Sequence, residues 1–184
     1  MAGMWTQRLS QQPLVPAVAG LALLSALFWA DCLFGPNAPL AAQFQAEMEP
    51  WRSETDLRSP TAQWCPLLWD GVAQFYPWRL FAAREARAGR LALWNPHQFC
   101  GYPFMANGQS ALLYPPNWLL PLIDVCWGMG LLAALHCFLA SLLSYLFARR
   151  VGIGPPAALF GAIAFAYGGF MVAWAELPTL VNSA

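Results

Sequence analysis

The chain has 184 residues, of which 59% are hydrophobic and only 10% are charged, and its mean hydropathy is +0.45. These values lie outside the usual range of globular proteins and indicate an integral membrane protein. Nine basic and nine acidic residues give no net charge, which argues against nucleic-acid binding through a basic surface.

The first expected element is a membrane helix over residues 14–34. The run is apolar and contains one charged residue, Asp31, near its end, and about 20 apolar residues cross the hydrocarbon core of a bilayer. A cleaved signal peptide is the alternative, but it has a shorter apolar region that ends at a small-residue cleavage site. The only such site, Ala17-Val18-Ala19, lies inside the run, so we favour a retained helix.

Residues 35–118 are expected to form one long loop, because they are rich in Pro and mix polar with aromatic side chains. The charged segment Glu47–Arg58 is typical of a solvated loop or a short helix. Between Gln74 and Arg90 aromatic residues recur at helical spacing while Arg residues lie on other faces. This pattern predicts an amphipathic helix, which either lies in the membrane interface or packs against the rest of the loop.

The last part of the loop contains four short motifs that impose turns. They are Trp94-Asn95-Pro96, Gly101-Tyr102-Pro103, Asn107-Gly108-Gln109-Ser110 and Tyr114-Pro115-Pro116-Asn117-Trp118. Pro and Gly prevent a long helix here, and Trp and Tyr are typical of the headgroup level. The segment therefore predicts an irregular, aromatic return to the bilayer.

Two further membrane helices are expected, over residues 119–148 and 155–174. Gly161, Gly168 and Gly169 in the last of these would allow close helix approach. Arg149 and Arg150 place the short connection in the cytoplasm by the positive-inside rule. The amino terminus with Arg8 would then be cytoplasmic, whereas residues 35–118 and the final AELPTLVNSA segment would be extracytoplasmic. The fold class is therefore an all-α integral membrane protein with three transmembrane helices.

Asp70 is the acidic residue with the most suggestive surroundings, because it stands at the start of the predicted amphipathic helix. A carboxylate near the interface can act as a general base on a hydroxyl, but an Asp at a helix start also commonly caps backbone amides. Asp31 and Asp124 are interpreted as residues at helix boundaries. His136 lies within a span, where a hydrogen bond between helices would satisfy it.

Other chemistry finds little support in the sequence. The five Cys residues form no CxxC motif or Cys/His cluster, so no metal site is predicted. Cys65 and Cys100 could form a disulfide if the loop is extracytoplasmic. There is no phosphate-binding Gly-rich motif, no HExxH and no nucleophile elbow, and no cofactor is indicated.

Four motifs in order carry a family resemblance. They are D-G-V-A-Q-F-Y-P at 70–77, G-R-L-A-L-W-N-P at 89–96, G-Y-P at 101–103 and Q-S-A-L-L-Y-P-P-N at 109–117. The series resembles the amino-terminal region of YfhO-type bacterial membrane proteins, which are similar to polyprenyl-phosphate-dependent glycosyltransferases of the GT-C fold. The resemblance covers nearly the whole chain.

The resemblance implies a sugar transferase on the outer face of the bacterial cytoplasmic membrane, with a polyprenyl-phosphate donor and a cell-envelope acceptor. Asp70 would be the catalytic base, since it matches the position of the acidic residue in the family's first outer loop. The substrate-binding candidates are Arg79, Arg84, Arg87, Asn95, Gln109 and Tyr114. The Arg residues could hold a phosphate through charge-assisted hydrogen bonds, although an Arg-rich interfacial helix can also simply contact anionic lipid.

Such proteins usually carry many more membrane spans than three. We therefore expect residues 1–184 to be a single membrane domain that is part of a larger protein, with the remaining carboxy-terminal part or other membrane subunits as partners. A non-catalytic membrane subunit or lipid-binding scaffold is the alternative function. A transporter is a weaker third hypothesis, because three spans without a repeat make a poor alternating-access core.

Overall fold

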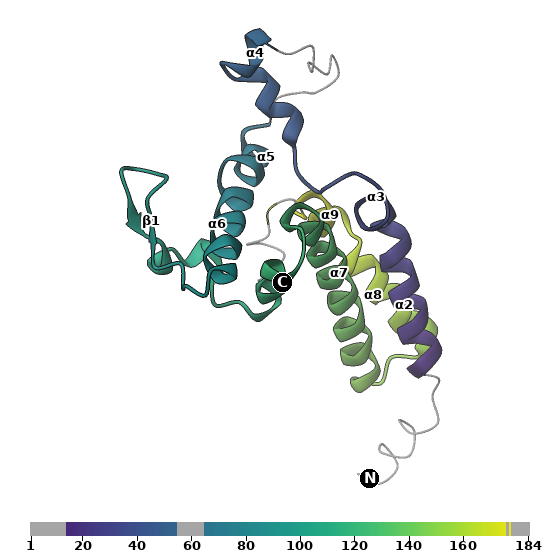
Figure 1. The fold of residues 1–184 in the computed structure, drawn as a ribbon. Helices are drawn as coiled ribbons and strands as arrows, with labels where there is room; N and C mark the ends of the chain where they lie inside the picture. The colour runs from purple at the N-terminus through teal and green to yellow at the C-terminus, as the bar shows by residue number, and fades with distance from the viewer. Residues whose placement is uncertain (1–13, 55–64, 176, 178–184) are drawn as a thin grey trace.

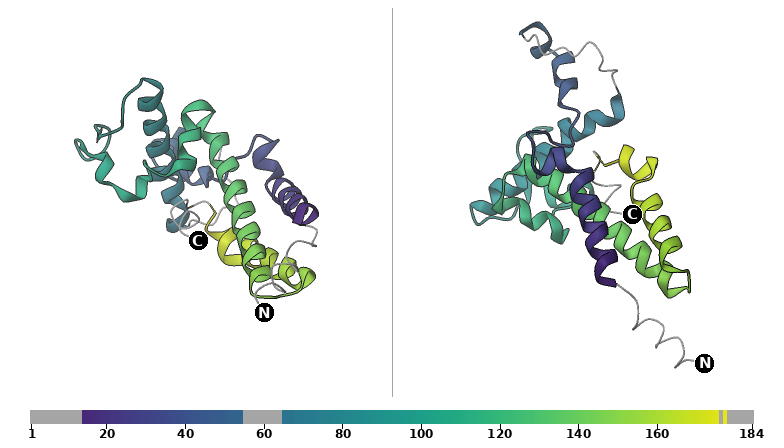
Figure 2. Two further views of the ribbon diagram at one scale, coloured as in Figure 1. Left: turned by 90° about the horizontal axis from the view of Figure 1, so that it is seen from below. Right: turned by 90° about the vertical axis from the view of Figure 1, so that its right-hand side faces the viewer.

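A computed structural model describes residues 14–54, 65–175 and 177, and it is mostly helical (Figure 1). Three helices form a bundle: α2 (Leu14–Phe28), α7 (Val125–Arg150) and α8 (Pro155–Ala166). Residues 66–123, which we call the loop unit, contact α7 on another side through α6 and η5 (Figure 2). The helix α7 therefore belongs to both halves of the molecule.

The remaining elements are short. They are α3 (Ala30–Leu33), η1 (Ala42–Glu47), α4 (Trp51–Glu54), α5 (Pro66–Asp70), η2 (Gly71–Phe75), α6 (Tyr76–Arg87), β1 (Trp94–Asn95), β2 (Tyr102–Pro103), η3 (Phe104–Ala106), η4 (Gly108–Ser110), η5 (Pro115–Leu122) and α9 (Gly169–Ala173).

Two stretches are long and apolar enough to cross a membrane, Val125–Arg150 and Pro155–Ala173. The second is interrupted at residues 167–168, between the end of α8 at Ala166 and the start of α9 at Gly169. The helix α2 has 15 residues, which corresponds to about 22 Å and is shorter than the hydrocarbon core of about 30 Å. After a turn at Trp29 the chain continues as α3. Some of the residues used in the sequence analysis lie outside the described part of the chain. They are Arg8, Asp56, Arg58 and most of the final AELPTLVNSA segment.

The boundaries of α7 follow from its flanking residues. Asp124 caps its start, because its side chain accepts a hydrogen bond from the Trp127 amide at 2.9 Å. Arg149 and Arg150 occupy its last turn, where cations are favourable. Residues 119–122, which the sequence assigned to this span, instead belong to the 3-10 helix η5, since Pro121 lacks an amide hydrogen and interrupts α-helical bonding.

Close packing in the bundle depends on Gly130 of α7. A Cβ added at Gly130 would lie 2.8 Å from Cβ of Cys32, so α3 can approach α7 only because this position is Gly. The expected role of Gly161, Gly168 and Gly169 is wrong in this structure. An added Cβ at Gly161 or Gly169 would meet nothing within 4 Å, and one at Gly168 would meet the carbonyl of Ala164 in the same stretch.

The predicted amphipathic helix is present, but it starts earlier than expected. The elements α5, η2 and α6 follow without a break from Pro66 to Arg87, and the middle element is a π-helix. Pro77 stands just after that π segment; it lacks an amide hydrogen, and its ring would clash with the carbonyl of residue 73 in regular α geometry. Asp70 therefore lies inside a helical stretch, and its side chain makes no capping hydrogen bond.

Beyond α6 the chain forms a two-stranded antiparallel hairpin, with Trp94 opposite Pro103 and Asn95 opposite Tyr102. Gly101 has φ +103°, and an added Cβ would lie 2.6 Å from Nε1 of Trp94, so only Gly fits beneath that ring. Phe104 is fully buried, and its ring meets Phe81 of α6 edge to face at 5.2 Å. The aromatic face of α6 therefore packs against the rest of the loop unit. This was one of the two interpretations of the helix in the sequence analysis.

The two cysteines considered for a disulfide, Cys65 and Cys100, are both free. Cys100 is exposed in the turn of the hairpin, where it and Phe99 both have positive φ.

Candidate functional site

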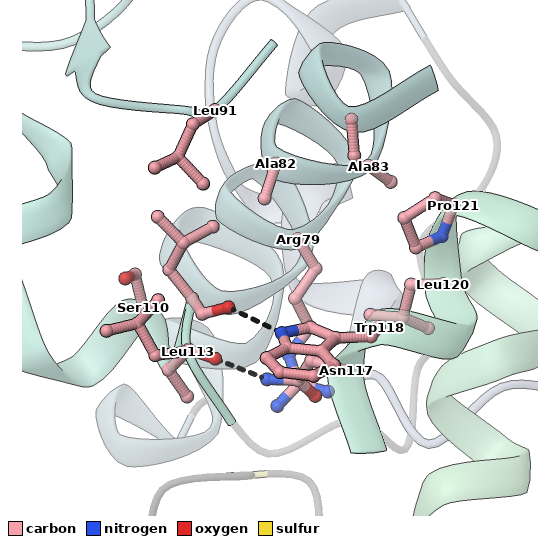
Figure 3. A pocket seen from close by; sticks show the side chains of 13 residues that line it. Arg79, Ala82, Ala83, Leu91, Ser110, Leu113, Asn117, Trp118, Leu120 and Pro121 are labelled. Carbon is pink, nitrogen blue, oxygen red and sulfur yellow. Dashed lines mark hydrogen bonds between the residues drawn. The ribbon is translucent and has the colours of Figure 1, made fainter. Parts of the chain in front are cut away.

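A pocket of about 340 Å³ lies between α6 and the segment that leads into α7 (Figure 3). One wall is the face of α6, and the other wall is formed by residues 110–121. Most lining side chains are apolar. The lining residues are Arg79, Ala82, Ala83, Ala86, Leu91, Ser110, Ala111, Leu112, Leu113, Asn117, Trp118, Leu120 and Pro121. Several of them come from the Q-S-A-L-L-Y-P-P-N motif.

Arg79 is the charged residue of this pocket. It is only 5% exposed, and it extends from α6 toward the side of the pocket formed by Asn117 and Trp118 (Figure 3). Among the described residues no hydrogen-bond acceptor or carboxylate partner for its guanidinium is found. Burial lowers the pKa of Arg79 to about 10, and the phenol of Tyr114 partly opposes that shift. The side chain is therefore protonated at neutral pH and has donors to spare.

Asn117 supplies the complementary group. Its Nδ2 donates a hydrogen bond to the carbonyl of Ala111 at 2.9 Å, which fixes the amide, whereas its Oδ1 is buried without a partner among the described residues. Beside it, Nε1 of Trp118 donates to the carbonyl of Leu112 at 3.3 Å. The pocket therefore presents a buried cationic donor, a buried free acceptor and apolar walls. A buried polar group without a partner is costly, and a ligand with an anionic and a hydroxyl group would satisfy both.

Tyr114 links this site to the bundle. Its hydroxyl lies 2.7 Å from Nε2 of His136, and the two rings are stacked with centroids 5.6 Å apart. Nδ1 of His136 lies 2.5 Å from the carbonyl of Leu132, which can only accept, so Nδ1 carries the hydrogen and Nε2 of a neutral ring accepts from Tyr114. The sequence suggested a hydrogen bond for His136 but did not identify Tyr114 as the partner.

Asp70 is half-buried, and its Oδ1 accepts a hydrogen bond from Nε2 of Gln74 at 3.0 Å, one turn further along the helix. It does not line the Arg79 pocket. The structure therefore contradicts the capping interpretation of Asp70 and does not bring its carboxylate to the guanidinium of Arg79.

The other predicted site residues are dispersed. Arg87 donates from Nε to the carbonyl of Pro121 at 2.8 Å and from Nη2 to Ile123 at 2.5 Å and Leu120 at 3.3 Å. These three hydrogen bonds satisfy carbonyls at the end of η5, so Arg87 stabilises the fold of the loop unit in this structure. Arg84 is exposed.

Asn95 and Gln109 also lie away from the pocket. Asn95 is buried in β1, and its Oδ1 accepts from the amide of His97 at 2.9 Å, which stabilises the turn of the hairpin. Gln109 is exposed in η4. Neither residue lines the pocket, whereas Asn117, which does, was not singled out among the candidates although it ends a quoted motif.

The exposed ion pair of the loop unit joins Arg90 and Glu85, with Nη2 and Oε1 2.8 Å apart. This hydrogen bond keeps the pKa of Glu85 below its usual range. Within residues 14–54, 65–175 and 177, no group of three or more His, Cys, Asp and Glu side chains could hold a metal ion. In the pocket itself, the guanidinium of Arg79 is the group that can bind an anion.

Comparison of the chain with models of protein families, with curated proteins and with solved structures gives no match.

Proposed function

We propose that the chain is part of a membrane glycosyltransferase-like protein that transfers a sugar from a polyprenyl-phosphate donor to a cell-envelope acceptor. The proposal combines the resemblance of the four loop motifs to YfhO-type proteins with one structural observation. That observation is Arg79, a buried guanidinium without an acceptor among the described residues, in a pocket with apolar walls.

The side chains that line the pocket support a lipid phosphate as its ligand. A charge that is buried without a counter-charge is costly, so Arg79 is best explained by an anionic group that binds there. Guanidinium is well suited to phosphate oxygens, and Asn117 Oδ1 could accept from a hydroxyl of an attached sugar. The apolar side chains of Leu91, Leu113 and Leu120 would contact the hydrocarbon next to the phosphate.

In this proposal Asp70 is the base that accepts the proton of the acceptor hydroxyl. The hydrogen bond from Gln74 leaves lone pairs of the Asp70 carboxylate free for a substrate. Replacement of Asp70 by Asn in the full-length protein should lower sugar transfer from a polyprenyl-phosphate donor by about 100-fold or more, the usual scale for a general base. Unchanged turnover would remove Asp70 from the mechanism.

The phosphate assignment has a separate test. Arg79→Met keeps a long apolar side chain but removes the charge, and it should weaken binding of polyprenyl phosphate by about tenfold or more. Arg52→Met, at an exposed position of α4, is the matched control and should bind as the natural chain does. Equal binding by both variants would show that the pocket does not hold the phosphate.

The second candidate is a non-catalytic subunit or scaffold that binds the same lipid. One observation favours it, since Asp70 does not line the pocket of Arg79. The two candidates differ in the expected effect of Asp70→Asn, because a scaffold would retain both its lipid binding and its effect on a partner when this carboxylate is lost.

We propose in addition that the chain lies in the bacterial inner membrane with three spans, a cytoplasmic amino terminus and residues 35–118 outside. The apolar helix α2, extended by α3, would be the first span, and the turn after Arg150 would be cytoplasmic. In chains whose five native cysteines are replaced by Ala, a membrane-impermeant thiol reagent added from outside should modify Ser53→Cys, next to Glu54, but not Val151→Cys, next to Arg150. The reverse labelling would invert the topology.

A further inference from the structure

We infer that residues 91–123, most of which belong to the connection proposed above to lie on the outer side, dip back into the bilayer as a re-entrant segment beside α7, so that the pocket of Arg79 opens toward the lipid and not toward water. The inference depends on the membrane-spanning character of α7 and not on transferase chemistry. One consequence rests on the proposed function: the polyprenyl-phosphate donor would enter the pocket laterally from the bilayer.

The depth of the segment is set by the contact between Tyr114 and His136. His136 is the twelfth residue of the 26-residue helix α7, and at a rise of about 1.5 Å per residue it lies about 16 Å from the start of the helix. The hydroxyl of Tyr114 is hydrogen-bonded to it at 2.7 Å. If α7 crosses a hydrocarbon core of about 30 Å, Tyr114 lies near the middle of the membrane.

The composition of the segment agrees with that depth. From Leu91 to Ile123 there are 33 consecutive residues without Asp, Glu, Lys or Arg, between Arg90 and Asp124. About a quarter of the residues of a soluble protein are charged, so a water-exposed stretch of this length would carry about eight charges. The absence of charge is confined to the part of the loop unit that follows α6.

Five carbonyls near the end of the segment are paired without water, as lipid requires of an irregular chain. The carbonyls of Ala111 and Leu112 accept from the side chains of Asn117 and Trp118. The carbonyls of Leu120, Pro121 and Ile123 accept from Arg87. Five carbonyls of an extended or 3-10 stretch are therefore paired with side chains of the loop unit itself.

Large apolar side chains point outward from this uncharged segment. Phe99 in the hairpin is 90% exposed, and Leu113 and Trp118 are 60% and 59% exposed. Leu113 and Trp118 also line the pocket of Arg79 (Figure 3), so the mouth of the pocket is part of the same surface. Apolar exposure on this scale marks an interaction surface, and lipid is the occupant that agrees with the depth, the missing charge and the paired carbonyls.

Fluorescence quenching in reconstituted vesicles tests the inference. In full chains whose five native cysteines are replaced by Ala, a single Cys at Leu113 or Phe99 carries an environment-sensitive nitrobenzoxadiazole label, and Ser53→Cys is the control. In vesicles of phosphatidylcholine and phosphatidylglycerol, lipids with a nitroxide on the acyl chain should quench the labels at 113 and 99 several-fold more strongly than the label at 53. Iodide in the water should give the opposite order.

Two outcomes would overturn the inference. Iodide quenching at 113 as strong as at 53 would place the segment in water, and protection from both quenchers would show that protein covers it, either another part of the chain or a partner. Because no donor sugar or turnover is involved, this result is independent of the transferase proposal.

A second measurement needs no cysteine replacement. In the natural chain, a phosphatidylcholine with a photoactivatable diazirine on its acyl chain should form adducts at Leu113 or Trp118 as well as at Leu143, an exposed residue of α7. Adducts at Leu143 without any in residues 91–123 would contradict the inference.

Discussion

The helix bundle and the loop unit share α7 but are held together by different interactions. In the bundle the buried side chains are apolar or small, such as Leu21 of α2, Tyr145 of α7 and Ala162 of α8. Polar links between its helices are the hydrogen bond from Ser25 Oγ to the carbonyl of Ala134, at 2.7 Å, and the one from Trp127 Nε1 to the carbonyl of Leu33, at 3.0 Å. In the loop unit, side chains of Arg, Asn and Trp donate to the backbone carbonyls of residues 111, 112, 120, 121 and 123.

The difference shows how each region specifies its structure. Apolar packing depends on volume and close approach, so it tolerates exchange among side chains of similar size. The loop unit lacks regular secondary structure for much of its length, and several of its polar side chains donate to backbone carbonyls in its irregular parts. Single polar substitutions should therefore affect the loop unit, whereas changes of size should affect the bundle.

The largest effect is expected at Arg79, whose buried guanidinium donates to no carbonyl among the described residues. Arg79→Met should lose the binding of lipid phosphate and yet raise the free energy of unfolding by about 1 kcal/mol or more, because it removes an unpaired buried charge. Thermal unfolding in detergent measures the second effect, with Arg52→Met as the control. A loss of stability at Arg79 alone would mean that the guanidinium has a structural partner and is not kept for a ligand.

The next effect concerns close approach in the bundle. Gly130→Ala should destabilise the protein by about 1–3 kcal/mol, because the new Cβ would overlap Cβ of Cys32. Gly161→Ala, where the added carbon meets nothing within 4 Å, should be neutral or gain up to about 1 kcal/mol from helix propensity. Equal unfolding midpoints for the two variants would show that the bundle is looser than the structure indicates.

A smaller effect is expected for Arg87, which closes the end of η5. Arg87→Ala should cost about 1–2 kcal/mol, since three hydrogen bonds from one charged group are lost but the site is partly exposed. Arg84→Ala, on an exposed face of the same helix, should change the free energy of unfolding by less than about 0.5 kcal/mol. If denaturation profiles of the two variants coincide, the polar contacts of the loop unit do not stabilise it.

The smallest effect separates two tyrosines. Tyr114→Phe should cost about 1 kcal/mol because Nε2 of His136 loses its donor. Tyr102→Phe should be neutral or slightly stabilising, because the Tyr102 hydroxyl is buried without a partner among the described residues. A lower unfolding temperature for Tyr114→Phe than for Tyr102→Phe would confirm that the Tyr114 hydroxyl stabilises the contact between the loop unit and α7; equal losses in the two variants would refute it.

Much of the bundle could be predicted from the sequence, because apolar length and the pair Arg149-Arg150 are local signals. The same signals did not show that α7 starts at Val125, since the residues before it are equally apolar and only the cap at Asp124 separates them. Nor could they identify Gly130 as the close contact. That contact depends on where α3 lies, which is a property of the folded chain.

The site was less predictable. Arg79 was among the candidates, but nothing local distinguished it from Arg84 or Arg87, because helical phase alone does not say which face meets the segment 110–121. The partner of His136 lies 22 residues away in an irregular stretch, beyond any periodic pattern. The start of the helix at Pro66 was missed because a π segment disturbs the 3.6-residue period that sequence analysis relies on.

That π segment has a geometric consequence for the two residues on which the proposed function depends. An α-helix advances about 100° per residue, and a π turn holds about one residue more than an α turn. The five residues Gly71–Phe75 stand between Asp70 and Arg79, so the π turn sets the angular offset between the carboxylate and the guanidinium. Deletion of a single residue there would restore regular α geometry and leave the direction of Asp70 relative to Arg79 nearly unchanged, because the shortened turn still makes about one full rotation. The same residues in unbroken α geometry would instead turn Asp70 away by about one residue's angle, so the relative direction of the two charges depends on the π turn and not on the identity of either residue.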